Sequence, residues 1–395
     1  MANGVQSVAV GTKERVFRRL PKALKSTARL AYLVLAMPFG GRRSINRLKF
    51  QSSVRKTERI NFVPPIFSVT INSTCNLRCP NCFYVLLGEE KAFEGGGMIK
   101  VEDFKAIIDK YGKYVELVSL TGGEALAHPK LDELVNIVKS KGVKVCVSTN
   151  GVFIERKFEV LKNFDSINVS LDGFDYESFK RYRAGTPEEF DKILHGLELL
   201  RKNNIPFGTS FVLSEENVHE VNFMLEIGHK TGASRVTFHN INAHGCEDFT
   251  SLKVGSEKVQ RMLDEVTSRN DYSFDIELPI VFDLESKDFA SQKCTQQWSM
   301  VCFNDKGHLS YCCYMDHDPS IGNMFQGYDL NAEKMRTFRS RMIKNEYPKD
   351  TCFMCQRRFA GQEYGNFYAS QKVWILKTAT VPGDKVIPLS PTTVL

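Results

Sequence analysis

Three cysteines follow one another at short spacing near residue 75. The stretch INSTCNLRCPNCF, residues 71–83, carries Cys75, Cys79 and Cys82. Thiolates are the ligands of iron–sulfur clusters, and a cubane cluster has four irons. Three cysteines can bind three irons and leave the fourth open to a small molecule, as an open catalytic zinc site keeps one position free. A zinc site with a distant fourth ligand is the alternative, although zinc typically uses cysteine pairs.

A second group of cysteines lies in the C-terminal third of the chain. The chain has 11 cysteines in 395 residues, which is too dilute for a small disulfide scaffold. Their clustering at close spacing indicates metal ligation. The second group comprises Cys294, Cys302, Cys312, Cys313, Cys352 and Cys355.

Strand-like and helix-like stretches alternate between residues 66 and 280. Apolar strands separated by helices predict a parallel sheet, and six such units predict an α/β fold that is a partial (β/α)6 TIM-like barrel rather than a closed eight-fold one. The predicted strands are 66–72, 115–120, 144–149, 167–171, 206–213 and 234–241.

Four polar motifs come at the ends of the first four predicted strands. In parallel α/β folds the chemistry lies in the loops after the carboxyl ends of the strands, so these motifs are expected to share one rim. They are Cys75 to Cys82, Thr121-Gly122-Gly123-Glu124, Ser148-Thr149-Asn150-Gly151 and Ser170-Leu171-Asp172-Gly173.

The N-terminal segment is basic and the remainder is acidic. Residues 1–60 hold 14 Lys or Arg and two Glu, so the net charge of this segment is larger than the +7 of the whole chain. The remainder of the chain therefore carries a net negative charge. A basic nucleic-acid-binding face on the body is therefore not predicted. We expect four parts: a basic segment 1–60, a barrel 61–285, a small cysteine-bearing domain 286–365 and a tail 366–395.

Residues 13–37 have apolar positions at helical spacing with interleaved Arg and Lys. Three interpretations are open for this amphipathic helix: packing on the body, contact with an anionic membrane surface, or a partner groove. The longest apolar run, 30–39, is far shorter than the roughly 20 residues that span a bilayer.

CNLRCPNC after the first predicted strand, with GGE after the second, resembles the radical S-adenosylmethionine (SAM) superfamily. The resemblance covers roughly residues 66–245. It implies a [4Fe-4S] cluster on Cys75, Cys79 and Cys82, with SAM chelated at the open iron. Reductive cleavage of SAM then yields methionine and a 5′-deoxyadenosyl radical, which abstracts a substrate hydrogen.

The same resemblance implies roles for the other strand-end motifs. Thr121, Gly122, Gly123 and Glu124 look like the segment that receives the SAM amino group. Ser148 and Asn150 are placed like residues that contact the ribose. Ser170 and Arg183 are similar to a pair that holds the SAM carboxylate, and Arg181 is a close rival of Arg183.

The second cysteine group resembles the auxiliary-cluster extensions called SPASM and Twitch. Cys294, then Gly307 and Cys312, then a Cys-x-x-Cys pair match the shorter Twitch form. The resemblance implies a second [4Fe-4S] cluster on Cys294, Cys312, Cys352 and Cys355. Cys302 and Cys313 are then spare, and either could substitute. A structural zinc is the alternative, because four cysteines with one such pair also suit zinc.

An auxiliary cluster that accepts an electron favours oxidation or epimerisation of a small-molecule, sugar or lipid-linked substrate. A peptide or protein maturase, like those that act on ribosomal peptides or sulfatases, is the alternative. A non-catalytic iron–sulfur or zinc protein is a third class. Cys246 is a candidate hydrogen donor, and His239 and His244 are candidate bases or substrate contacts. For each, a core or surface role is the competing interpretation.

The cofactors and partners follow from these expectations. Low-potential clusters require a reducing compartment, so we expect a cytoplasmic protein, peripheral at the membrane if residues 13–37 bind there. The resemblance implies a reductant such as flavodoxin or ferredoxin. No nucleic-acid partner is expected.

Overall fold

The computed structural model of the chain describes residues 41–82, 96–241, 248–253, 255–268, 272, 274–279, 294–346, 352 and 374–377. The predicted N-terminal helix at 13–37 lies outside these residues, as do His244, Cys246 and Cys355. In the part of the chain that is described, no helix is both long and apolar enough to cross a membrane.

The six predicted strands are confirmed as neighbours in one parallel sheet. Their observed ends differ from the predicted ones by up to two residues. Strands that follow one another in sequence pair in order, as expected when each is joined to the next by a helical crossover. They are β1 (Ile66–Asn72), β2 (Leu117–Gly122), β3 (Lys144–Thr149), β4 (Ser166–Ser170), β5 (Gly208–Leu213) and β6 (Arg235–Asn240).

Short strands extend the sheet beyond both ends of this six-strand core. β7 (Asp275–Leu278) runs parallel to β6, and β10 (Trp374–Lys377) pairs antiparallel with β7. At the other edge, β8 (Met300–Phe303) runs parallel to β1, and β9 (Leu309–Ser310) pairs antiparallel with β8. The cysteine-bearing region therefore contributes strands to the same sheet as the barrel.

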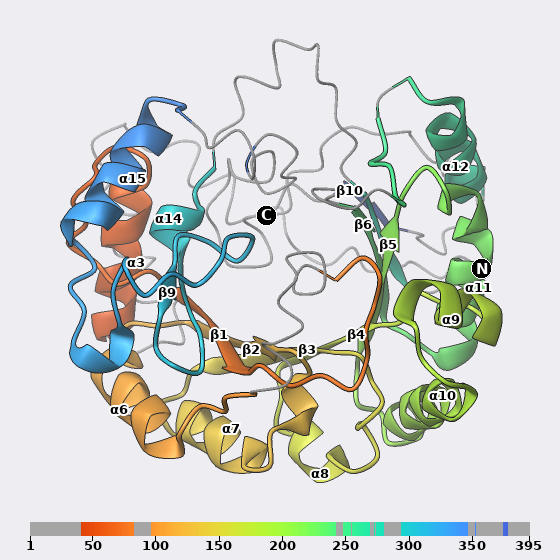
Figure 1. The fold of residues 1–395 in the computed structure, drawn as a ribbon, viewed down its shortest axis with the longest axis horizontal. Helices are drawn as coiled ribbons and strands as arrows, with labels where there is room; N and C mark the ends of the chain where they lie inside the picture. Colours follow the sequence, from red (N-terminus) through yellow and green to blue (C-terminus); the bar gives the residue numbers. More distant parts are fainter. Residues whose placement is uncertain are drawn as a thin grey trace, which may run out of the picture.

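Helices cover the outer side of the curved sheet, as Figure 1 shows. Those that follow the core strands are α6 (Val101–Tyr111), α7 (Leu131–Ser140), α8 (Phe158–Leu161), α9 (Tyr176–Arg183), α10 (Pro187–Lys202), α11 (Val221–Thr231) and α12 (Glu257–Ser268). α10 begins with a capping box in which Thr186 and Glu189 satisfy each other's backbone N–H groups, and Pro187 fits the first turn.

The strands of the core present opposite chemistry on their two faces. In β3, Val145, Val147 and Thr149 are buried, whereas Lys144, Cys146 and Ser148 are exposed or half-buried and line a cavity. Because successive strand residues point to opposite faces, one face packs on the helices and the other lines a polar interior. This barrel therefore encloses a cavity of about 1500 Å³ rather than a packed apolar core.

Buried arginines join the N-terminal segment to the barrel and to the C-terminal region. Arg43 in α3 (Gly41–Ser53) donates to the carbonyls of Gly112, Lys141 and Gly142, which follow α6 and α7. Arg339 in α15 (Glu333–Ile343) is 1% exposed. It donates to the carbonyls of Glu58, Gln297 and Leu330. Gln297 belongs to the short helix α14 (Gln296–Ser299). A guanidinium group has five N–H donors, so one side chain can join several loops.

Candidate active site

The three cysteines near residue 75 lie in the turn that follows β1. The Leu77 N–H donates to Cys75 Sγ at 3.4 Å, and the Cys82 N–H donates to the Cys79 carbonyl at 3.0 Å. Burial raises the pKa of Cys75 to about 11, and neighbouring Cys79 and Cys82 add to the rise. Burial also raises the pKa of Cys79. Metal coordination requires thiolates, so metal binding here would release protons.

Gly122 and Gly123 let the end of β2 approach this turn closely. A Cβ atom at position 122 would meet the Asn72 carbonyl oxygen at 2.5 Å, closer than real Cβ contacts allow. A Cβ at position 123 would come within 2.5 Å of the Thr74 carbonyl carbon and 3.0 Å of Cys75 Cβ. Only glycine fits such a close approach without a backbone shift. The Gly-Gly pair therefore holds the cysteine turn against β2.

The Glu124 carboxylate joins the ends of β2 and β3. Its Oε1 accepts from Thr149 Oγ1 at 2.6 Å and from the Leu126 N–H at 2.9 Å, and its Oε2 accepts from the Asn150 N–H at 2.7 Å. The residue is 1% exposed, and burial raises its pKa. The side chain therefore fixes the relative position of two strand ends.

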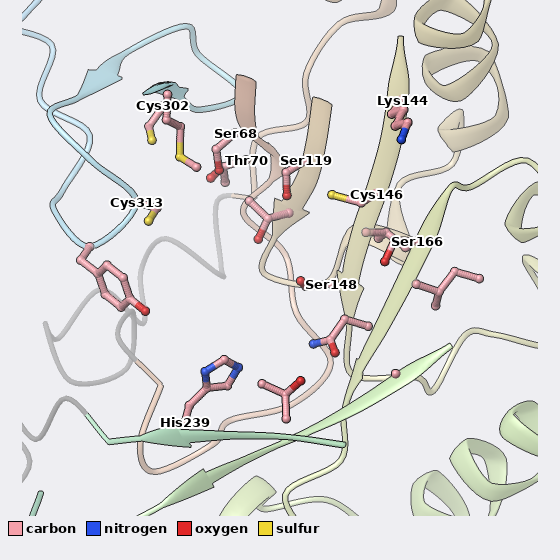
Figure 2. Close-up of a pocket in the computed structure, with 18 of the residues that line it drawn as sticks. Ser68, Thr70, Ser119, Lys144, Cys146, Ser148, Ser166, His239, Cys302 and Cys313 are labelled. Atoms are coloured by element: carbon pink, nitrogen blue, oxygen red, sulfur yellow. The ribbon is translucent and has the colours of Figure 1, made fainter. Parts of the chain in front are cut away.

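Asn150 links β3 to the cysteine turn. Its Nδ2 donates to Asn76 Oδ1 at 2.8 Å and lies 3.9 Å from Cys75 Sγ. Its Oδ1 accepts from the Val152 N–H at 3.0 Å. Asn76 in turn donates to Glu189 of the α10 capping box at 2.9 Å. Ser148, two residues earlier on β3, instead faces the cavity (Figure 2).

Arg183 lies beside the cysteines, and Arg181 does not. Arg183 Nη1 donates to Cys79 Sγ at 3.4 Å, Nη2 donates to the Ser170 carbonyl, and Nε lies 3.3 Å from Asp172 Oδ2. Burial alone would lower the pKa of Arg183, but Cys79 and Asp172 together raise it above its usual range. Arg181 is 60% exposed and pairs with Glu220 instead.

The end of α9 aims Arg183 at this position. Asp175 and Ser178 form the capping box that starts the helix, and Arg183 is its last residue. Ala184 then takes a left-handed conformation with φ 51°, which ends the helix. Asp172 also has positive φ, at 51°, and its Oδ1 accepts from the Val212 N–H at 2.7 Å. Asp172 belongs to the strand-end motif Ser170-Leu171-Asp172-Gly173, and the motif by itself predicted no role for this carboxylate.

The cavity inside the sheet is lined by hydroxyl, thiol and amide side chains together with charged residues and histidines. Figure 2 shows Ser68, Thr70, Ser119, Cys146, Ser148 and Ser166 on the wall, with His239 on β6 and Cys302 and Cys313 from the C-terminal region. His239 therefore lines the cavity, and its role as a base or a substrate contact stays a prediction. In the sequence, small polar residues recur at every second position of these strands. This pattern could have predicted the polar wall of the cavity.

The second cysteine group is partly described. Cys294 is half-buried; desolvation raises its pKa to about 11, and the charges of Cys352 and Cys313 add to the rise. These two thiols are therefore electrostatic neighbours of Cys294. Cys313, taken as spare, is exposed, whereas Cys302 is buried. Cys312 accepts the Tyr314 N–H on its sulfur at 3.4 Å. The ligand set of an auxiliary cluster stays a prediction.

The surroundings of Cys75 fit a cluster that carries a polar ligand. Thr74 Oγ1 is buried without a hydrogen-bond partner among the described residues, and a ligand would satisfy it. The Arg183 guanidinium supplies positive charge next to Cys79. In the described part of the chain, no group of three or more His, Cys, Asp or Glu side chains is arranged to hold a single metal ion.

Residues 69–227 match the model of the Radical SAM superfamily. This part of the chain is therefore similar to radical SAM domains. Such domains use a [4Fe-4S] cluster and SAM, and the match includes the cysteine turn, the Gly-Gly pair and Arg183.

The chain is also similar to curated proteins. The chain is 25% identical over 264 residues to the antilisterial bacteriocin subtilosin biosynthesis protein AlbA of Bacillus subtilis (strain 168), covering 64% of this chain and 55% of AlbA. It is 28% identical over 180 residues to the AdoMet-dependent heme synthase of Methanosarcina barkeri (strain Fusaro / DSM 804), covering 45% of this chain and 50% of that protein. The chain thus spans about half of the length of these relatives.

Solved structures share the fold. Streptococcus suis SuiB bound to S-adenosylmethionine matches with a TM-score of 0.58 and 15% identity, covering 83% of this chain and 80% of SuiB. SuiB bound to its precursor peptide SuiA matches with a TM-score of 0.56 and 16% identity, covering 75% and 71%. At this identity the likeness supports a partial barrel and nothing about the substrate.

Proposed function

We propose that this chain is a radical SAM enzyme that removes a hydrogen atom from a peptide substrate. The observation that carries the proposal is the position of Arg183, whose fork contacts Cys79 and the end of β4. When bound, a reduced [4Fe-4S] cluster supplies reductive cleavage of SAM to methionine and a 5′-deoxyadenosyl radical, which takes a hydrogen atom from the substrate.

The chain's own residues would bind and orient these groups. Cys75, Cys79 and Cys82 would hold the cluster. Gly122 and Gly123 would leave room for the amino end of SAM, and Arg183 would bind its carboxylate, since an arginine fork matches a carboxylate.

The remaining predicted SAM-binding residues divide into contacts and positioning residues. Ser148 faces the cavity and is kept as a ribose contact. The side-chain atoms of Asn150 and Glu124 are taken by internal hydrogen bonds, so we assign both to positioning.

A peptide substrate is supported by the size and chemistry of the cavity. Its volume of about 1500 Å³ exceeds the 300–1000 Å³ or so of a typical small-molecule pocket, which leaves room for a substrate beside SAM. Its hydroxyl and amide lining can pair with backbone N–H and C=O groups, whereas an acyl chain would leave these wall groups without partners. The name of one similar protein, a bacteriocin biosynthesis protein, agrees with this substrate class. We therefore prefer the maturase alternative to the small-molecule, sugar or lipid-linked substrates.

A small-molecule substrate is the second candidate. The relative named as a heme synthase favours it, because its similarity to this chain is comparable to that of AlbA. An auxiliary cluster on Cys294, Cys352, Cys355 and either Cys312 or Cys313 would serve either substrate class as an electron acceptor. A reductant such as flavodoxin or ferredoxin would supply the electron for SAM cleavage.

The first test is release of 5′-deoxyadenosine by anaerobically reconstituted protein with SAM and dithionite. The matched control replaces all three cysteines: Cys75→Ala, Cys79→Ala, Cys82→Ala. We expect release by the wild type and none by the triple variant. A wild type that binds no iron would overturn the proposal and return the three cysteines to zinc.

The second test compares substrate classes. A pooled random-sequence peptide library is compared with a pool of nucleotides, sugar phosphates and porphyrins for stimulation of 5′-deoxyadenosine release. Stimulation by the peptides alone supports the maturase, and deuterium transfer from labelled peptide into 5′-deoxyadenosine identifies the position attacked. Stimulation by the small-molecule pool alone would favour the second candidate.

A further inference from the structure

The two ends of the segment that carries the cysteines lie side by side. The Ser73 N–H donates to the Gly97 carbonyl at 3.0 Å, and the Ile99 N–H donates to the Ile71 carbonyl at 2.8 Å. An antiparallel bridge joins Asn72 to Met98 between these bonds. The position of this short ladder therefore determines where the chain enters the cysteine turn, two residues before Cys75.

A carboxylate from the C-terminal region lies against both ends. Asp305, in the turn between β8 and β9, accepts from Ser73 Oγ on its Oδ1 at 3.1 Å. A Cβ atom at position 97 would overlap Asp305 Oδ2, so the carboxylate occupies the space that only a glycine leaves open. Asp305 is 7% exposed and, like its neighbours Asn304 and Lys306, lines the cavity.

The turn that presents Asp305 is held in place by its own hydrogen bonds. Asn304 Oδ1 accepts from the N–H groups of Lys306 and His308 at 3.1 and 2.9 Å. Asn323 Nδ2 donates to the Lys306 carbonyl at 2.9 Å, and Gly307 takes the positive φ of 78° that the turn requires. A side chain on such a turn has little freedom to move away from its partner.

We propose that Asp305 is a positioning residue for the SAM-cleaving site, holding the entry to the cysteine turn through Ser73 and Gly97. The inference rests on the function proposed above. A hydrogen bond to an ionised carboxylate is stronger than one between neutral groups, and here the bond is partly buried. The cysteine-bearing C-terminal region would thereby act on the geometry of the first cluster without binding it.

The test uses the full chain with four variants. Asp305→Asn removes the charge, and Ser73→Ala removes the donor. The matched controls are Asp318→Asn and Ser320→Ala, because Asp318 also accepts from a serine hydroxyl, Ser320 Oγ at 2.7 Å, on an exposed part of the same region. The measurements are amide hydrogen exchange over residues 71–79, the electron paramagnetic resonance (EPR) signal of the reduced cluster with SAM, and 5′-deoxyadenosine release.

We expect Asp305→Asn and Ser73→Ala to speed exchange over residues 71–79, alter the EPR signal and slow release by about tenfold, with both controls like the wild type. A fifth variant combines Asp305→Asn with Ser73→Ala. Its release of 5′-deoxyadenosine should be no slower than that of the more severe single variant, because both substitutions remove the same interaction. Unchanged exchange and an unchanged EPR signal in both variants would overturn the inference. A wild type that binds no iron would overturn the proposed function and, with it, the positioning role of Asp305. If the variants of that iron-free protein still exchanged faster over residues 71–79, the Ser73–Asp305 hydrogen bond would be a structural contact only.

Discussion

Arg183 Nη1 lies 3.4 Å from Cys79 Sγ, although 104 residues separate the two in sequence. The contact joins the last residue of α9 to the turn after β1. It exists because both segments follow carboxyl ends of strands in one parallel sheet, and such ends share a rim. The chemistry proposed for this chain depends on that convergence.

Replacing Arg183 should abolish most SAM cleavage. Arg183→Gln removes the charge and the fork, so we expect a decrease of about 100-fold in 5′-deoxyadenosine release, in line with losses from misplaced reactants. Arg183→Lys keeps the charge that balances buried Asp172 but lacks the fork, so it should recover stability more than activity. The control is Arg181→Gln, which should stay within about twofold of wild type because Arg181 pairs with Glu220 at the surface. Equal losses from Arg183→Gln and Arg181→Gln would contradict the assignment.

A side chain at position 123 should prevent cluster assembly. In Gly123→Ala the new Cβ would overlap the Thr74 carbonyl and press on Cys75 Cβ, so the turn must shift. We expect iron and sulfide per chain to fall about tenfold after anaerobic reconstitution. Gly41→Ala is the control, because no atom of the described residues lies within 4 Å of its Cβ position. Iron content like that of the wild type in Gly123→Ala would show that the turn tolerates the methyl group.

The fold should lose stability in mild acid through His317. Burial, with a smaller effect from His308, lowers the pKa of His317 from 6.5 to about 4. The neutral form is favoured in the folded state, so this contribution is fully present above pH 6.5 and is lost as the pH falls toward about 4. The loss should be at most about 2 kcal/mol, because the side chain keeps partial solvent access. Thermal unfolding midpoints measured from pH 7 to pH 4 should fall less in His317→Gln than in the wild type. If the unfolding midpoint fell equally with pH in the two proteins, His317 would not be the cause of the loss of stability in acid.

Arg339→Met should loosen the C-terminal region from the segment that precedes β1. The substitution keeps much of the side chain's volume but leaves the carbonyls of Glu58, Gln297 and Leu330 without their donor. Buried groups left unpaired cost free energy, so we expect a loss of about 3 kcal/mol in the free energy of unfolding of this region. Urea denaturation and limited proteolysis would measure it, with exposed Arg341→Met as the control on the same helix. A midpoint within error of the control would contradict the prediction.

Sequence analysis recovered the six core strands because their patterns are local. Stretches such as IFSVTIN and KVCVST carry β-branched residues between helical segments, and each spans a whole strand of the sheet. It missed β7 to β10, which have two to four residues each. Such short strands carry too little pattern to recognise, and they form because a neighbouring strand offers unpaired backbone groups.

The sequence alone determined the chemistry available to this protein, because cysteine spacing and a Gly-Gly pair after a strand are properties of a short stretch of chain. It could not decide between Arg181 and Arg183, two residues apart on one helix, because that choice depends on which side of the helix faces the cysteine turn. It also assigned no role to Asp305, which lies 232 residues from Ser73. Only the tertiary structure decides such pairs, because the packing of strands and turns brings distant side chains within hydrogen-bond distance.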